Sequence, residues 1–102
     1  MKKVSIIIPT LNSHRVVKSQ IIRLQNILSL YQNDIDVIII DDGSNPSLVE
    51  YLKENNFTFI KTGKTQEGLD VWGLDNIFII ETKNYNKWTQ AIACKILWCY
   101  FR

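Results

Sequence analysis

The chain is poor in several residue types that mark particular classes of protein. Only two of its 102 residues are cysteine, which argues against a disulfide-stapled secreted domain and favours a reducing, cytosolic environment. The net charge of +2 is too small to indicate binding to nucleic acid or to an anionic membrane. No apolar run reaches the roughly 18 residues of a membrane-spanning helix. The segment before Pro9 is too short for the core of a signal peptide.

Two apolar runs are the most informative feature that is present. Residues 4–8 and 35–40 are rich in isoleucine and valine, and each run is followed by a polar loop, residues 9–12 and 41–44. Continuous apolar runs of this length are typical of strands buried on both faces of a parallel sheet. Because ligands of open α/β sheets bind beyond the carboxyl ends of strands, the two loops predict a nucleotide-type site.

A helix is expected between the two runs. Pro9 should end the first strand because it lacks a backbone donor, and Asn12 or Ser13 should cap the helix. Apolar residues then recur at helical spacing, at Val17, Ile21, Leu24, Leu28 and Tyr31. The chain length fits one domain, and a strand, helix and strand in this order predict a βαβ unit.

The second half of the chain has a weaker pattern. A helix should begin near Pro46, with Ser44 or Asn45 as its cap, and end at Asn55 and Asn56. We then expect strands at 57–60 and 77–80, irregular structure at 62–76, and a helix at 86–101. This last helix is apolar nearly all round and therefore needs cover. A missing C-terminal half or a second copy of the chain is expected to cover it.

The two strand–loop motifs together resemble family 2 glycosyltransferases, which have the GT-A fold. The resemblance covers roughly the first 50 residues. It implies an α/β fold, a truncated, Rossmann-like GT-A domain with three α/β/α layers and a mostly parallel sheet of three or four strands. Residues 1–102 would form one partial nucleotide-binding domain, with 63–82 as an atypical insertion.

The likeness becomes weaker after residue 50. The family continues with an Asn-x-Gly segment, where this chain has Asn84, Tyr85 and Asn86. The family's Asp-x-Asp motif and the acceptor half with its catalytic base have no counterpart up to Arg102. The resemblance implies Mn²⁺ or Mg²⁺ for a complete enzyme, with the metal site absent here. No catalytic or metal-binding residue is therefore assigned, and whether this chain is itself an enzyme stays open.

The resemblance implies a nucleotide-binding site in the two loops. Asp42 would accept a hydrogen bond from the nucleotide base, and Asp41 would support the loop. Gly43 would permit a backbone shape that a β-carbon resists. A plain turn with Ser44 as a helix cap is the alternative, and for Asn12 a capping role is equally open. The expected binding residues are Pro9, Thr10, Asn12, Asp41, Asp42, Gly43 and Ser44.

Other chemically capable side chains are assigned no function. His14 is expected to be solvated at a helix start. The aromatic and cysteine side chains of the last segment should pack in a core, namely Trp88, Trp98, Cys94 and Cys99. Asn84 and Lys87 should serve at the surface or as caps. Three acidic residues have no standard metal-loop spacing, namely Glu67, Asp70 and Asp75.

The leading hypothesis is a segment that binds a UDP-sugar, from an enzyme that transfers the sugar to a saccharide or lipid-linked acceptor, as in cell-envelope polysaccharides. Alone it should be inactive, cytoplasmic, and free of nucleic acid; peripheral membrane association stays open. The alternative is a non-catalytic remnant or an oligomerisation module. A receiver-like phosphoacceptor domain fits less well because its acidic pair follows the first strand. A Rossmann dehydrogenase lacks support because no Gly-x-Gly-x-x-Gly motif is present.

Overall fold

The fold is built around one mixed β-sheet. The computed structural model describes residues 4–31, 34–66 and 68–82. Five strands occur in this part: β1 (Val4–Thr10), β2 (Ile35–Asp41), β3 (Ile60–Lys64), β4 (Asp70–Leu74) and β5 (Ile77–Glu81). Their order in the sheet is β1-β2-β5-β4-β3. Strands β1, β2 and β5 are mutually parallel, whereas β4 runs antiparallel to both β5 and β3. The expectation of a mostly parallel sheet of three or four strands is therefore wrong, because the β3–β4 hairpin adds two strands in antiparallel pairing.

The predicted βαβ unit is confirmed in its elements. Strands β1 and β2 are parallel neighbours joined by α1 (His14–Leu28). Strand β1 continues through Pro9 to Thr10, so the prediction that Pro9 ends the strand is wrong. Of the strands that the structure describes, β1 lies at one edge, and an edge strand tolerates a residue without a backbone donor.

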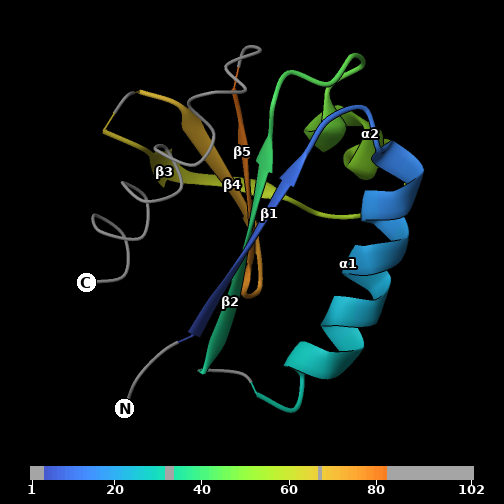
Figure 1. Ribbon diagram of the computed structural model, residues 1–102, viewed down its shortest axis with the longest axis vertical. Helices are drawn as coiled ribbons and strands as arrows, with labels where there is room; N and C mark the ends of the chain where they lie inside the picture. Colours follow the sequence, from blue (N-terminus) through green and yellow to red (C-terminus); the bar gives the residue numbers. More distant parts are fainter. Residues whose placement is uncertain (1–3, 32–33, 67, 83–102) are drawn as a thin grey trace.

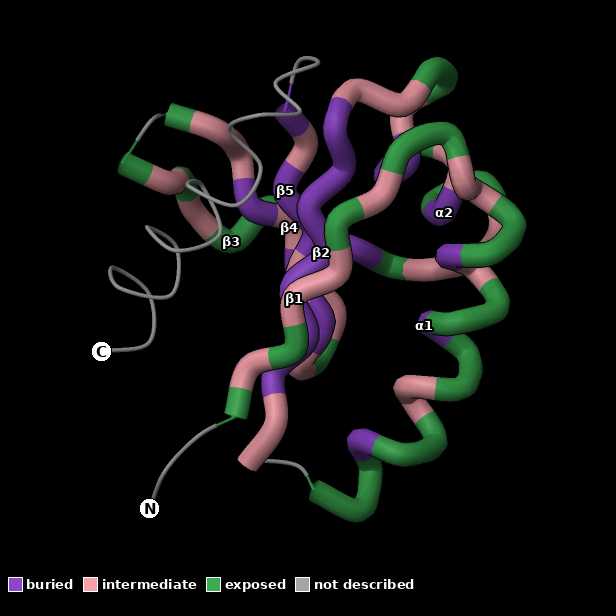
Figure 2. Tube along the Cα trace, in the orientation of Figure 1, coloured by how far each residue is buried: buried purple, intermediate pink, exposed green. Residues whose placement is uncertain are grey.

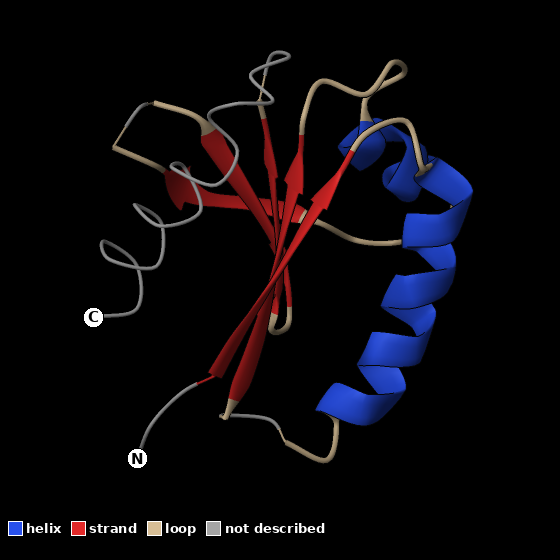
Figure 3. Ribbon diagram, viewed as in Figure 1, coloured by secondary structure: helices blue, strands red, loops and turns tan. Residues whose placement is uncertain are grey.

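The two helices cover one face of the sheet. The second helix, α2 (Leu48–Glu54), lies beside α1 on the same face (Figures 1 and 3). Both helices bury apolar side chains against β2 and β5. The buried residues of this core are Val17, Ile21, Leu28, Val37, Ile39, Leu48, Val49, Leu52, Phe59, Ile77 and Ile79. The predicted stripe is correct up to Leu28; Tyr31 lies beyond the helix and is 48% exposed.

The opposite face of the sheet is also apolar. Ile38, Ile40, Val71 and Ile80 form a second buried cluster there, and Figure 2 shows β2 buried along nearly its whole length. The continuous apolar run of β2 thus supplies both faces, as expected for an inner strand. The predicted third layer, the helix at 86–101, lies outside the residues that the structure describes. So do Asn84, Lys87 and the cysteine and tryptophan residues assigned to that segment.

The segment expected to be irregular, 62–76, is largely a β-hairpin, so that prediction is wrong. Strand β3 begins only at Ile60, so the strand expected at 57–60 is also wrong except for its last residue. A β-carbon at Gly73 of β4 would approach Thr62 Cγ2 to 2.9 Å, so a larger residue there would force the Thr62 side chain to shift. This hairpin extends the sheet beyond β5, and the strand expected at 77–80 is confirmed as β5.

Candidate functional site

The candidate site lies at the carboxyl ends of β1, β2 and β5. Because these three strands are parallel, the segments that follow them emerge at the same end of the sheet (Figure 1). The loop after β1 comprises residues 11–13, and the loop after β2 comprises residues 42–47. Register pairs Thr10 with Asp41 and Asp41 with Glu81, which aligns the three strand ends. The structure therefore brings together the two loops that the sequence singled out, and adds the end of β5.

Asp41 holds the loop that follows it. Its side chain is fully buried, and Oδ2 accepts a hydrogen bond from the Ser44 backbone N–H at 3.0 Å. Asp41 Oδ1 accepts a second bond from the Ser44 hydroxyl. Between them, Gly43 has φ of 91°, in the left-handed region that favours glycine. The expected supporting contacts of Asp41 and the expected special backbone at Gly43 are both observed.

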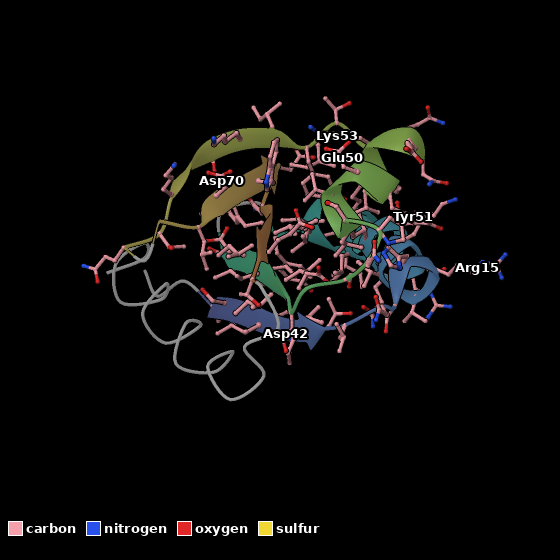
Figure 4. The ribbon with its side chains drawn as sticks, turned by 90° about the horizontal axis from the view of Figure 1, so that it is seen from above. Arg15, Asp42, Glu50, Tyr51, Lys53 and Asp70 are labelled. Carbon is pink, nitrogen blue, oxygen red and sulfur yellow. The ribbon has the colours of Figure 1, made fainter. Side chains whose placement is uncertain are left out.

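Asp42 is directed toward the neighbouring strands. It is 4% exposed, and its Oδ1 accepts a hydrogen bond of 2.8 Å from the Thr82 hydroxyl, at the end of β5. Its backbone N–H donates to the Thr10 carbonyl at 2.9 Å. Seen from above, Asp42 lies beside the end of β1 (Figure 4). Asp42 therefore connects the ends of all three parallel strands, through its backbone to β1 and through its carboxylate to β5.

Asn12 joins the two loops and does not cap α1. Its backbone N–H donates to Ser44 Oγ at 2.7 Å, and its Oδ1 accepts from the Asn45 N–H at 3.0 Å. The N-cap position of α1 is Ser13, whose hydroxyl makes no capping bond and instead donates to the Leu11 carbonyl. The capping alternative for Asn12 is thus wrong. Its conformation, with φ of 48°, is one that asparagine tolerates better than most residues.

Ser44 does not cap α2 either. The cap is Ser47, whose hydroxyl accepts from the Glu50 N–H at 3.3 Å and donates to Glu81 Oε2 at 2.8 Å. Glu81 Oε2 also accepts from the Leu48 N–H at 3.2 Å. The end of β5 therefore anchors the start of α2, and Ser44 is left to connect Asp41 with Asn12.

His14 lies at the start of α1, as expected, but it is half-buried and has partners in addition to solvent. Its Nε2 lies 2.6 Å from the Pro46 carbonyl oxygen, and its ring meets the Tyr51 ring edge-on at 5.2 Å. Tyr51 reaches the start of α1 from α2 (Figure 4). Together with Asn12, His14 fixes the loop after β1 to the loop after β2.

Sequence analysis did not assign any role to Glu81 and Thr82. A signal was present, because both follow the predicted strand at 77–80 in the same way that the acidic loop follows β2. Their contact with the site depends on β5 pairing directly with β2, and pairing of strands so far apart in the chain is not encoded in local pattern.

Within residues 4–31, 34–66 and 68–82, no group of three or more histidine, cysteine, aspartate or glutamate side chains is arranged to hold a metal ion. Asp70 instead pairs with Lys61 at 3.2 Å, and Asp75 lies in the β4–β5 turn. None of the described helices is both long and apolar enough to cross a membrane.

The two hydrogen bonds by which Asn12 joins the loops predict an effect on stability. Asn12→Ala removes the Oδ1 acceptor. It also places alanine at a positive φ that asparagine tolerates better. We expect the free energy of unfolding to fall by about 2 kcal/mol. Asn26→Ala, on the exposed side of α1, should change it by less than about 0.5 kcal/mol. Urea unfolding followed by circular dichroism measures the free energy of unfolding of both variants. Equal values would contradict the role of Asn12 in joining the two loops.

The fold is an α/β domain whose two polar loops meet at the carboxyl ends of its parallel strands. Comparison with known families places it more narrowly: the sequence model of glycosyl transferase family 2 matches residues 5–71 of the 102-residue chain. The chain belongs to this family, as its two loop motifs suggested. Searches of curated proteins and of solved structures gave no match. The matched region contains β1, α1, β2, α2 and β3, and therefore both loops of the candidate site.

Proposed function

We propose that this chain binds the nucleoside diphosphate part of a sugar donor, UDP in the first instance, and that Asp42 accepts a hydrogen bond from the base. One observation supports this most strongly. Asp42 is a buried carboxylate at the carboxyl end of a central parallel strand, in a member of a glycosyltransferase family. Uracil N3–H is a donor, and a charged acceptor strengthens such a bond. Because Asp42 is 4% exposed, the base would displace groups that now shield it.

The loop after β1 would supply the opposite wall of the same pocket. The Thr10 carbonyl accepts a hydrogen bond from the Asp42 backbone N–H. Two further hydrogen bonds hold Asn12 to the loop after β2. A loop already held in one shape loses less conformational freedom when a ligand binds. Pro9 belongs to this proposed wall, whereas Gly43 and Ser44 belong to the wall on the side of the loop after β2. We propose no transfer step for these residues.

Calorimetric titration of the chain with UDP tests the proposal, with ADP as the control and with Mn²⁺ present or absent. We expect saturable UDP binding without Mn²⁺, and ADP at least about tenfold weaker, the equivalent of about 1.4 kcal/mol. Adenine lacks the imide N–H from which the Asp42 carboxylate would accept a hydrogen bond. Absence of UDP binding under every condition, or equal binding of ADP, would contradict the proposed function and favour a non-catalytic interaction module.

A further inference from the structure

Thr82 makes two hydrogen bonds to the acidic pair at the end of β2. Its backbone N–H donates to the Asp41 carbonyl at 2.7 Å, and its hydroxyl donates to Asp42 Oδ1 at 2.8 Å. Both side chains are nearly inaccessible, at 3% exposed for Thr82 and 4% for Asp42. The pairing of Asp41 with Glu81 in the sheet places Thr82 directly beside Asp42. A buried hydroxyl–carboxylate bond is therefore built into the candidate site.

The two bonds have separable consequences. The backbone bond continues the β2–β5 ladder, and it persists whatever side chain stands at residue 82. The hydroxyl bond acts on the carboxylate itself, because it limits rotation of the Asp42 side chain. A carboxylate offers about four acceptor positions, so the bond from Thr82 does not by itself prevent Asp42 from accepting a bond from a ligand. The β-branched threonine side chain also has few χ1 rotamers, which keeps its hydroxyl in one direction.

We propose that Thr82 is a positioning residue for base recognition: its hydroxyl fixes the orientation in which the Asp42 carboxylate accepts the base N–H. This inference rests on the proposed function, since it assigns the device that orients the same carboxylate. A purely structural role would make Thr82 matter for folding only. A positioning role makes it matter for discrimination at the base edge that Asp42 contacts.

The test compares UDP with N3-methyl-UDP, which lacks the imide donor, on the wild-type chain and on Thr82→Val, Thr82→Ser and Asp42→Ala. Thr82→Val has nearly the same volume without the hydroxyl, and Thr82→Ser restores it. We expect Thr82→Val to bind UDP about tenfold more weakly, the effect of about one hydrogen bond. Its preference for UDP over N3-methyl-UDP should shrink, and Thr82→Ser should recover most of that preference. Thermal unfolding of each variant confirms that folded chains are compared.

The outcomes separate the two claims. If the wild-type chain does not bind UDP, the proposed function fails and the inference fails with it. If Asp42→Ala weakens UDP binding but Thr82→Val keeps the wild-type affinity and preference, the inference alone is overturned. If Thr82→Val does not fold, Thr82→Cys replaces it under the same criteria, because cysteine keeps a weaker donor in similar volume. Loss of affinity with an unchanged preference for UDP over N3-methyl-UDP would also overturn the positioning role.

Discussion

Asp42→Ala is expected to weaken UDP binding by about 10- to 100-fold, since a hydrogen bond to a charged group contributes about 1.5–3 kcal/mol. Asp42 follows β2, its carboxylate accepts a hydrogen bond from the Thr82 hydroxyl after β5, and its backbone N–H donates to the Thr10 carbonyl of β1. Asp41, the neighbouring acidic residue at the end of β2, is already bonded to Ser44 of the loop that follows it. Loss of Asp42 should therefore remove the acceptor for the base.

The same change should also lower stability, which requires a control. Removal of the carboxylate leaves the buried Thr82 hydroxyl without this acceptor, at a cost of about 1–3 kcal/mol. Binding must therefore be measured on chains shown to be folded. Asp70→Ala serves as the matched control, because Asp70 lies on β4 away from Asp42 (Figure 4) and pairs with Lys61 at a partly exposed position. It should leave UDP affinity unchanged; an equal loss in both variants would contradict a specific role for Asp42.

Ile39→Ala should lower the free energy of unfolding by about 3 kcal/mol, within the range measured for isoleucine truncation in cores. Ile39 lies in the middle of β2, between Ile8 of β1 and Ile79 of β5, and only 1% of its surface is exposed. It packs in the cluster that joins the sheet to both helices. Because small domains have only about 5–15 kcal/mol of stability, a loss of this size moves the unfolding midpoint far.

Ile60→Ala is the matched control for this prediction. Ile60 also lies in a strand, but in β3 at the other edge of the described sheet, and it is 61% exposed. The free energy of unfolding of Ile60→Ala should fall by less than about 1 kcal/mol, because little apolar surface is removed from a packed environment. Urea unfolding of both variants measures the difference. Similar losses for Ile39 and Ile60 would contradict the assignment of the core to the helix-covered face.

The first half of the fold could be predicted because its signals are local. The apolar run around Ile38 suits a strand buried on both faces, and the stripe from Val17 to Leu28 fits one helical face. The two loops were found for the same reason, since each follows such a run. The β3–β4 hairpin was missed because β3 is exposed at most positions and has little apolar periodicity to recognise. Strand β4 contains Gly73, and glycine is depleted in strands.

The contacts inside the site were less predictable because they join distant residues. Asn12 resembles a cap in sequence, yet it bonds to Ser44 and Asn45, more than thirty residues away. Thr82 contacts Asp42 only because β5 pairs with β2, while β3 and β4 are placed further out in the sheet. Local pattern therefore located the loops, whereas the bonds that shape them depend on strand order.

The most direct test of the account is an amide ¹H–¹⁵N NMR titration of the chain with UDP. The account predicts saturable shifts at the loop amides of residues 10–12 and 42–45 and at Thr82, with the amides of the β3–β4 hairpin unchanged. Asp42→Ala should remove those shifts at the same UDP concentration. Shifts confined to the hairpin or to the exposed side of α1, or no shifts at saturating UDP, would contradict a nucleotide site at the ends of β1, β2 and β5.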